Sequence, residues 1–165
     1  MTLLPYLAGY SPELQDQALT LLKSGELGAR LRKQYSESHQ VHSSKSLHVY
    51  VQDLKAKHMR KAAPLAKVCY DDKMHVGRDA LGLHITTTRV QGTKLKKRRE
   101  LRVASLFKEA PASFLRMIVV HELAHMKHTE HDRDFYKLCV YMESDYHQLE
   151  LDLRLYLTEL EWEQS

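Results

Sequence analysis

Cysteine, proline, glycine and tryptophan are all scarce in this chain of 165 residues. Four prolines and six glycines are too few for a collagen-like or low-complexity sequence. The two cysteines, Cys69 and Cys139, lie far apart and form no CxxC pair. This spacing suits a reducing compartment better than a disulfide framework, so we expect two free thiols.

Long apolar runs are missing as well. No apolar stretch approaches the length that is needed to span a bilayer. The first residues, MTLLPYLAGYSPEL, lack the basic region and the long apolar core of a secretory signal. We therefore expect a soluble cytoplasmic protein without a membrane partner, while the sequence does not indicate an oligomeric state.

The composition is that of a globular protein, with 43% hydrophobic and 28% charged residues. The length suits one hydrophobic core, so we expect a single domain over residues 1–165. The net charge of +4 is mild, but basic residues cluster at 55–61 and in the run Lys94-Leu95-Lys96-Lys97-Arg98-Arg99. Such runs form either a solvated face or an anion-binding patch.

Hydrophobic periodicity predicts helices, then a sheet, then helices again. In the N-terminal part, Ser11 is a candidate helix N-cap followed by Pro12, and Gly25 is a candidate stop. After Pro111 the helical period returns, with further starts near Asp132 and Asp145. The predicted helices cover about 11–25, 27–35, 44–60 and 111–126. A further helix starts near 132, and the last one runs from about 145 to the C-terminus.

Between these helical zones, short runs rich in β-branched and aromatic residues predict strands. Asp71-Asp72-Lys73 has the composition of a tight turn. Together these signals predict an α+β fold with a small, mainly antiparallel sheet. The predicted strands are 67–70, 74–76, 83–90 and 100–107.

The segment His121-Glu122-Leu123-Ala124-His125 matches HExxH and lies inside a predicted helix. Residues four apart share one face of a helix, so both imidazoles can reach one metal ion while Glu122 stands beside it. A metal-activated water next to a carboxylate base is the chemistry of hydrolases. The alternative, a surface helix with solvated histidines, is disfavoured by the apolar residues 117–120 that precede the motif.

A third ligand is expected from the run HELAHMKHTEH. His131 follows His125 by six residues, so a turn after the helix can bring it back to the metal. His128 is the competitor, but it would stand a turn further along the same helix. Three histidines and a water favour one zinc ion per chain, although other divalent metals can occupy such a site.

The stretch ELRVASLFKEAPASFLRMIVVHELAHMKHTEHDRDFY, residues 100–136, resembles the YgjP-like metallopeptidases, which are related to the SprT-like and WLM zincins. The resemblance implies a minimal zincin-like domain and carries over to His121, Glu122, His125 and His131. It also implies that strand 100–107 is the edge along which an extended peptide pairs. At 88–93 the sequence TRVQGT differs from the Ser-Arg-Trp-Gly-Ser-Cys-like stretch of many members, so the resemblance leaves the substrate open.

Two residues near the motif have two candidate roles each. His147, beside Tyr146, is a candidate hydrogen-bond donor to a developing oxyanion, or it packs the last helix. Asp132 is a candidate partner for a ligand imidazole, or the N-cap of the next helix.

Three functions fit these residues. The leading prediction is a zinc metallopeptidase with Glu122 as general base. The second is a nucleoside triphosphate pyrophosphohydrolase that uses the same site and a basic substrate-binding surface. The third is a nucleic-acid-associated module, although an acid next to an open metal position argues against a purely structural ion. The candidate substrate-binding residues are Arg89, Lys94, Lys96, Lys97, Arg98 and Arg99.

Overall fold

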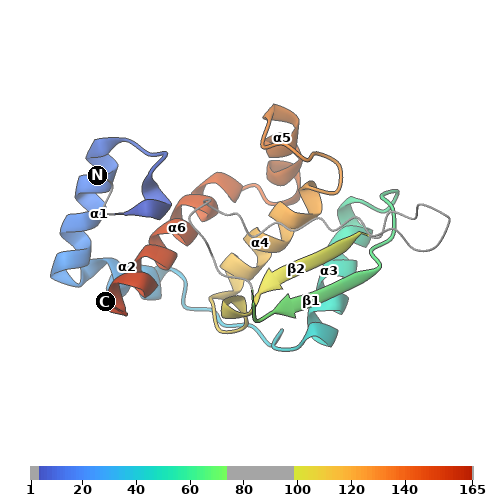
Figure 1. The fold of residues 1–165 in the computed structure, drawn as a ribbon, viewed down its shortest axis with the longest axis horizontal. Coiled ribbons are helices and arrows are strands. Elements are labelled where there is room, and N and C mark those ends of the chain that lie inside the picture. The colour runs from blue at the N-terminus through green and yellow to red at the C-terminus, as the bar shows by residue number, and fades with distance from the viewer. Residues whose placement is uncertain (1–3, 74–98, 165) are drawn as a thin grey trace.

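The structure, a computed structural model, describes residues 4–73 and 99–164 (Figure 1). The chain there is α+β, as predicted, and it is mostly helical. None of the helices in these two ranges is both long enough and apolar enough to cross a membrane. The elements are η1 (Pro5–Leu7), α1 (Pro12–Ser24), α2 (Glu26–Gln34), α3 (Ser44–His58), β1 (Lys67–Asp71), β2 (Glu100–Ala104), η2 (Ser105–Lys108), α4 (Ala112–Ala124), α5 (Arg133–Met142) and α6 (Tyr146–Glu163).

Local chemistry sets the ends of the helices. The Ser11 side chain accepts a hydrogen bond from the amide of Leu14 and so caps α1. At the other end of α1, Gly25 adopts a φ of +80°, a left-handed conformation that glycine reaches without a steric penalty. A reciprocal capping box between Ser43 and Ser46 starts α3. The predicted helix starts are therefore confirmed, because each depends on residues close in sequence.

The prediction of an antiparallel sheet is wrong for the described strands. β1 pairs with β2 in parallel, with Lys67 opposite Glu100 and Asp71 opposite Ala104. A parallel pair needs a long connection, and residues 72–99 separate the two strands. The antiparallel prediction rested on a hairpin between 67–70 and 74–76, and the predicted strands 74–76 and 83–90 lie outside the described residues.

The second strand is also shorter than predicted. β2 ends at Ala104, and residues 105–108 form the 3-10 helix η2 instead of continuing to Phe107. Phe107 is fully buried in this turn. Its burial explains why the apolar pattern continued past the end of the strand.

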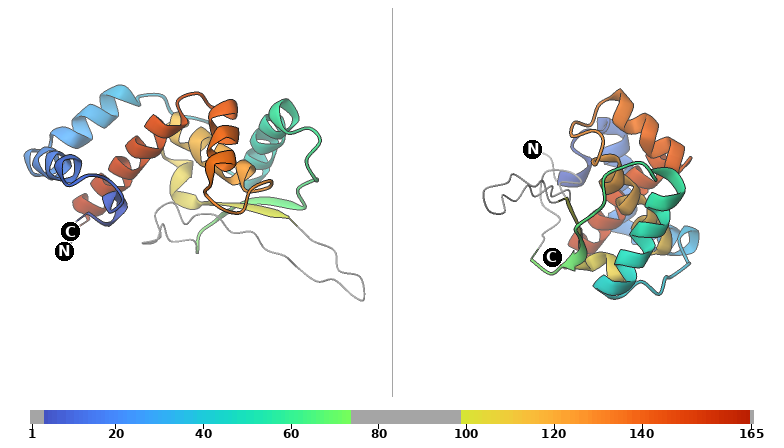
Figure 2. Two further views of the ribbon diagram at one scale, coloured as in Figure 1. Left: turned by 90° about the horizontal axis from the view of Figure 1, so that it is seen from above. Right: turned by 90° about the vertical axis from the view of Figure 1, so that its right-hand side faces the viewer.

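Helix α4 is the central element (Figures 1 and 2), and it contacts β2, α5 and α6. Its side chains are buried on almost every face, from Phe114 to Ala124, with the exception of Arg116. A helix that is apolar all round belongs in a core, where its position is set by packing on all sides. The HExxH segment is thus carried by the most constrained helix of the described chain.

Candidate metal centre

The last turn of α4 and the residue that follows it bring two histidines and one acid to the same buried place. His121, Glu122 and His125 are exposed by only 2%, 5% and 4%. Polar side chains with so little exposure require partners or an ion, because burial without compensation costs several kcal/mol, on the order of 2–7 for one polar group. The arrangement expected from the four-residue spacing is therefore present.

Three imidazoles converge through their Nε2 atoms. Nε2 of His125 lies 3.1 Å from Nε2 of His121 and 3.0 Å from Nε2 of His131. Tetrahedral nitrogen ligands about 2.05 Å from a zinc ion would be separated by roughly 3.3 Å. The spacing of the three nitrogen atoms thus fits one metal ion, and these histidines form a group able to hold one.

In His121 and His125, the opposite ring nitrogen contacts an oxygen atom. Nδ1 of His125 lies 3.0 Å from the carbonyl oxygen of His128, and Nδ1 of His121 lies 2.7 Å from the hydroxyl of Tyr146. A carbonyl oxygen can only accept, so Nδ1 of His125 carries the hydrogen and its Nε2 presents a lone pair to the cluster. Oxygen partners at the outer nitrogen are typical of histidines that bind metals. The chemistry of the donor set therefore fits a divalent transition-metal ion.

The turn between His125 and His131 settles the position of the competing histidine. His128 contributes its backbone carbonyl to His125, as described above, and its amide donates to the carbonyl of Ala124. His131 lies beyond this turn, with its ring exposed and its Nε2 directed at His125. The structure thus brings His131, and not the ring of His128, to the other two histidines.

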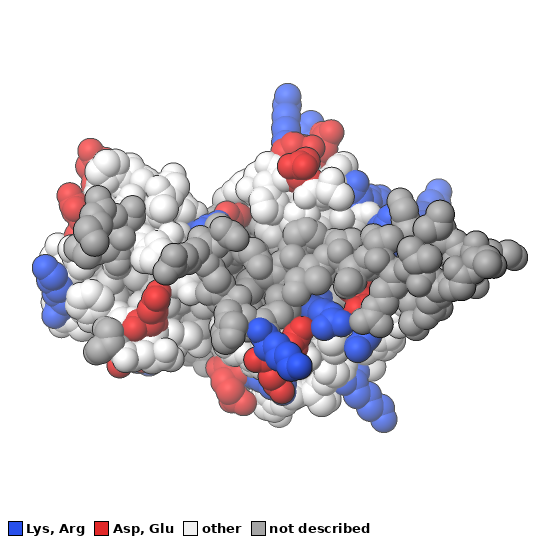
Figure 3. All heavy atoms as spheres, in the orientation of Figure 1, with Lys and Arg blue, Asp and Glu red and all other residues white. Residues whose placement is uncertain are grey.

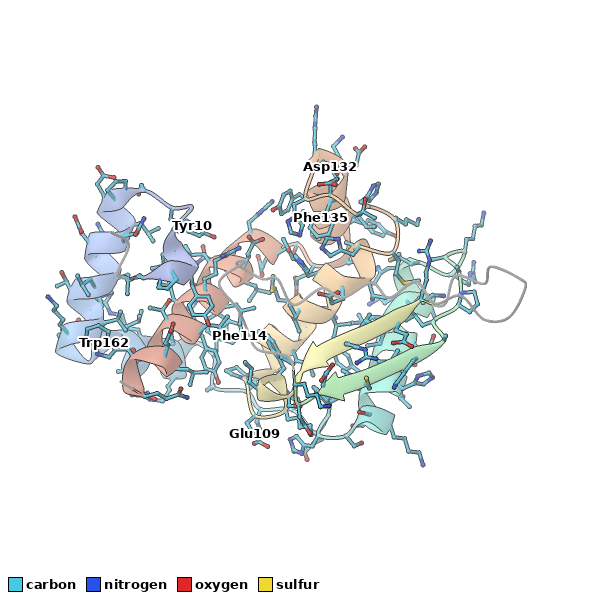
Figure 4. All side chains as sticks on the ribbon, viewed as in Figure 1. Tyr10, Glu109, Phe114, Asp132, Phe135 and Trp162 are labelled. Carbon is cyan, nitrogen blue, oxygen red and sulfur yellow. The ribbon has the colours of Figure 1, made fainter. Side chains whose placement is uncertain are left out.

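Phe135 forms an apolar wall that the motif alone did not reveal. Figure 4 shows it on the first turn of α5, next to the end of α4. Its fully buried ring lies with its centroid 5.1 Å from that of His121, 4.5 Å from that of His125 and 5.0 Å from that of His131. Asp132 accepts a hydrogen bond from the amide of Phe135, so it caps α5 and thereby places this ring.

Glu122 shares the buried environment of His121 and His125. Burial raises the pKa of the Glu122 carboxyl well above its usual range. A divalent cation nearby favours the ionised carboxylate and would lower this pKa again. A carboxylate that is buried beside a cation is suited to accept a proton from an attacking water.

The last helix supplies Tyr146, whereas His147 lies at the surface. Tyr146 is fully buried and its hydroxyl reaches His121, as described above. His147 is exposed, and its ring lies 5.4 Å from that of Tyr136. Sequence analysis placed Tyr146 beside the candidate residue but did not assign it the contact. The contact depends on how α6 packs against α4, which no local pattern indicates.

Part of the basic surface lies at the C-terminal end of α4. Arg99, the one described member of the predicted substrate-binding set, donates a hydrogen bond to the carbonyl of Met126. Lys127, which follows Met126 in sequence, lines a hollow of about 420 Å³ together with the end of α3. On the face shown in Figure 3, several Lys and Arg side chains emerge around this α3 end of the molecule. The remaining candidates, Arg89, Lys94, Lys96, Lys97 and Arg98, lie outside the described residues.

With this geometry in place, the class of protein is clear. The family described as "YgjP-like, metallopeptidase domain" matches residues 10–156, and the chain belongs to this family. It is a metal-dependent hydrolase. In sequence the chain is 52% identical to "UTP pyrophosphatase" of Escherichia coli (strain K12), over 97% of this chain and 96% of that protein. No solved structure gives a significant match.

Proposed function

We propose that the protein is a zinc-dependent nucleoside triphosphate pyrophosphohydrolase that converts UTP and water to UMP and pyrophosphate. The observation that carries this proposal is the 52% identity to a UTP pyrophosphatase along almost the whole of both chains. The proposal reverses the order of the two hydrolase functions predicted from the sequence. Both use the same histidines and the same acid, so the change concerns only the substrate.

In this function the three histidines bind the metal ion and Glu122 acts as the general base. His121, His125 and His131 hold the zinc ion, which supplies charge neutralisation and Lewis-acid polarisation at the phosphates when it is bound. Glu122 accepts a proton from the water that attacks the α-phosphorus. The bond between the α-phosphorus and the bridging oxygen breaks, pyrophosphate leaves, and the proton taken by Glu122 passes to the products.

The charges near α4 favour an anionic substrate. Arg99 is held at the end of α4 by the carbonyl of Met126, and Lys127 follows immediately. Lys57, Arg60 and Lys61 line the same hollow as Lys127. Cationic side chains near a phosphate-hydrolysing site lower the free energy of a polyphosphate substrate and its transition state. A neutral peptide gains nothing from them.

A peptidase remains the second candidate, because the family is described as a metallopeptidase domain and the HExxH segment is intact. In this function an extended peptide would pair with β2, which among the described strands is hydrogen-bonded to β1 alone. The nucleic-acid-associated function stays a prediction that salt-dependent, sequence-independent binding would support.

The first test compares the wild type with Glu122→Gln and His125→Ala. We expect the wild type and Glu122→Gln to carry about one zinc ion, and His125→Ala to lose it. Glu122→Gln should lose at least ~100-fold in UTP turnover, because general base catalysis is worth about 10²–10⁴-fold. In H₂¹⁸O, mass spectrometry should find the label in UMP. Label in pyrophosphate alone, or full activity of Glu122→Gln, would refute this mechanism.

A charge reversal separates the two substrates. Lys127→Glu should raise KM for UTP by about tenfold, which corresponds to roughly 1.4 kcal/mol, and change kcat less. Lys23→Glu is the matched control, since Lys23 is an exposed lysine in the last turn of α1, far from α4. Hydrolysis of uncharged peptides, followed in the same preparations, should not depend on Lys127. If UTP is untouched by the wild type while peptides are cleaved, the peptidase function replaces the one proposed.

A further inference from the structure

His121 and His125 are fixed by different kinds of oxygen. The partner of His125 is a backbone carbonyl, which can only accept a hydrogen bond. The partner of His121 is the Tyr146 hydroxyl at 2.7 Å, which can donate or accept. Two tautomers of neutral His121 are therefore compatible with this contact. Only the tautomer with its hydrogen on Nδ1 presents the Nε2 lone pair to the other histidines.

The hydroxyl of Tyr146 has a single hydrogen, and the direction of that hydrogen determines which ring nitrogen of His121 is protonated. If Tyr146 donates to Nδ1 of His121, the neutral imidazole carries its hydrogen on Nε2, which blocks metal binding there. If the hydroxyl hydrogen goes to another acceptor, the Tyr146 oxygen accepts from Nδ1 and Nε2 is a ligand. A second acceptor beside Tyr146 would therefore determine whether His121 can bind a metal.

Cys139 is the candidate for this acceptor. It lies on α5, is fully buried, and its side chain interacts with that of Tyr146. Burial raises the pKa of the Cys139 thiol to about 12, so its sulfur stays protonated. A neutral sulfur still accepts a weak hydrogen bond. Three helices thus contribute one side chain each to a series of contacts: Cys139 on α5, Tyr146 on α6 and His121 on α4.

We propose that Tyr146 and Cys139 are positioning residues of the metal centre: Cys139 accepts the hydroxyl hydrogen of Tyr146, so that Tyr146 accepts from Nδ1 of His121 and directs Nε2 to the metal. This inference depends on the metal centre of the proposed function and not on which substrate is hydrolysed. It also gives α5 and α6, the two helices that follow the HExxH segment, a direct part in metal affinity.

The test measures zinc affinity by competition with a chromophoric chelator, without any substrate. Tyr146→Phe removes only the hydroxyl and should weaken zinc binding about 10–100-fold, the usual effect of losing an outer partner of a ligand histidine. Tyr70→Phe is the matched control, because it removes another buried tyrosine hydroxyl, one that bonds to the carbonyl of Val41 at 2.6 Å. That control should bind zinc within about twofold of the wild type.

Cys139 is tested by a double-mutant cycle. Cys139→Ala should weaken zinc binding in the wild type and have little further effect in Tyr146→Phe, whereas Cys139→Ser keeps an acceptor and should restore most of the affinity. A merely structural role would instead weaken binding equally in both backgrounds. ¹⁵N NMR of the zinc-loaded protein should find the His121 hydrogen on Nδ1.

Wild-type affinity in Tyr146→Phe, or a Cys139→Ala effect that is the same in both backgrounds, would overturn the inference. Neither result depends on UTP turnover. If the affinity changes are found but the wild type does not hydrolyse UTP, the proposed function fails while the positioning role stands.

Discussion

Among the described histidines, the ring nitrogens contact different kinds of groups, and His58 contrasts with His121 and His125. The Nε2 atom of His58, at the end of α3, is buried and has no hydrogen-bond partner among the described residues. The ring instead packs edge-on against Tyr141, with centroids 5.5 Å apart. Desolvation, and then the charges of Lys57 and Arg116, lower the pKa of His58. The folded protein therefore favours its neutral form.

This environment predicts a pH dependence of stability. Because the pKa is lower in the folded than in the unfolded chain, the unfolded state binds more protons as the pH falls below about 6.5. Stability is then complete above that value and decreases as the pH falls toward the folded pKa. The metal-free wild type should lose more free energy of unfolding between pH 7.5 and 5.5 than metal-free His58→Gln, as measured in urea. Equal losses would exclude His58 as a source of the dependence.

Among the elements, α2 and α6 are joined by a buried polar contact as well as by apolar packing. At the end of α2, the Tyr35 hydroxyl donates to the carboxylate of Asp152 on α6, and Gln148 donates to the other oxygen at 3.1 Å. Asp152 is 5% exposed. Desolvation and this hydrogen bond raise the pKa of Tyr35, so the hydroxyl keeps its proton and remains a donor. The contact connects helices that are far apart in sequence.

Loss of that donor should be costly. Tyr35→Phe leaves a buried carboxylate with one hydrogen bond fewer, and we expect a decrease of about 1–3 kcal/mol in the free energy of unfolding. Tyr141→Phe, at a tyrosine that is 67% exposed, is the control and should change stability by less than about 0.5 kcal/mol. Chemical denaturation of both variants measures the difference. A Tyr35→Phe variant as stable as the control would show that the carboxylate finds a replacement donor.

For the whole molecule, the three histidines that could hold a metal ion connect the end of α4 to the turn that leads into α5. An ion that binds the folded but not the unfolded chain stabilises it by about 2.7 kcal/mol at a concentration 100 times its Kd. Addition of EDTA should therefore lower the Tm of the wild type, and zinc should restore it. The Tm of His125→Ala should respond to neither. A wild-type Tm that is indifferent to both would mean that the centre does not bind zinc.

Sequence analysis predicted the features that depend on neighbours along the chain. Ser11, Gly25 and Asp132 mark helix ends through their own hydrogen bonds or backbone conformation. The four-residue spacing of His121 and His125 places both on one helix face, whatever the helix packs against. These are short-range effects, so the helix ends and the placement of these two histidines on one helix face could be predicted without a tertiary structure.

Features that depend on distant segments could not be derived in this way. The parallel pairing of β1 with β2, the wall formed by Phe135 and the contact of Tyr146 with His121 join residues brought together only by packing around α4. The HExxH spacing was enough to predict which side chains are candidates for the chemistry. The groups that hold these side chains in place could be identified only from the tertiary structure, because hydrogen bonds and apolar contacts between separate elements depend on how those elements pack.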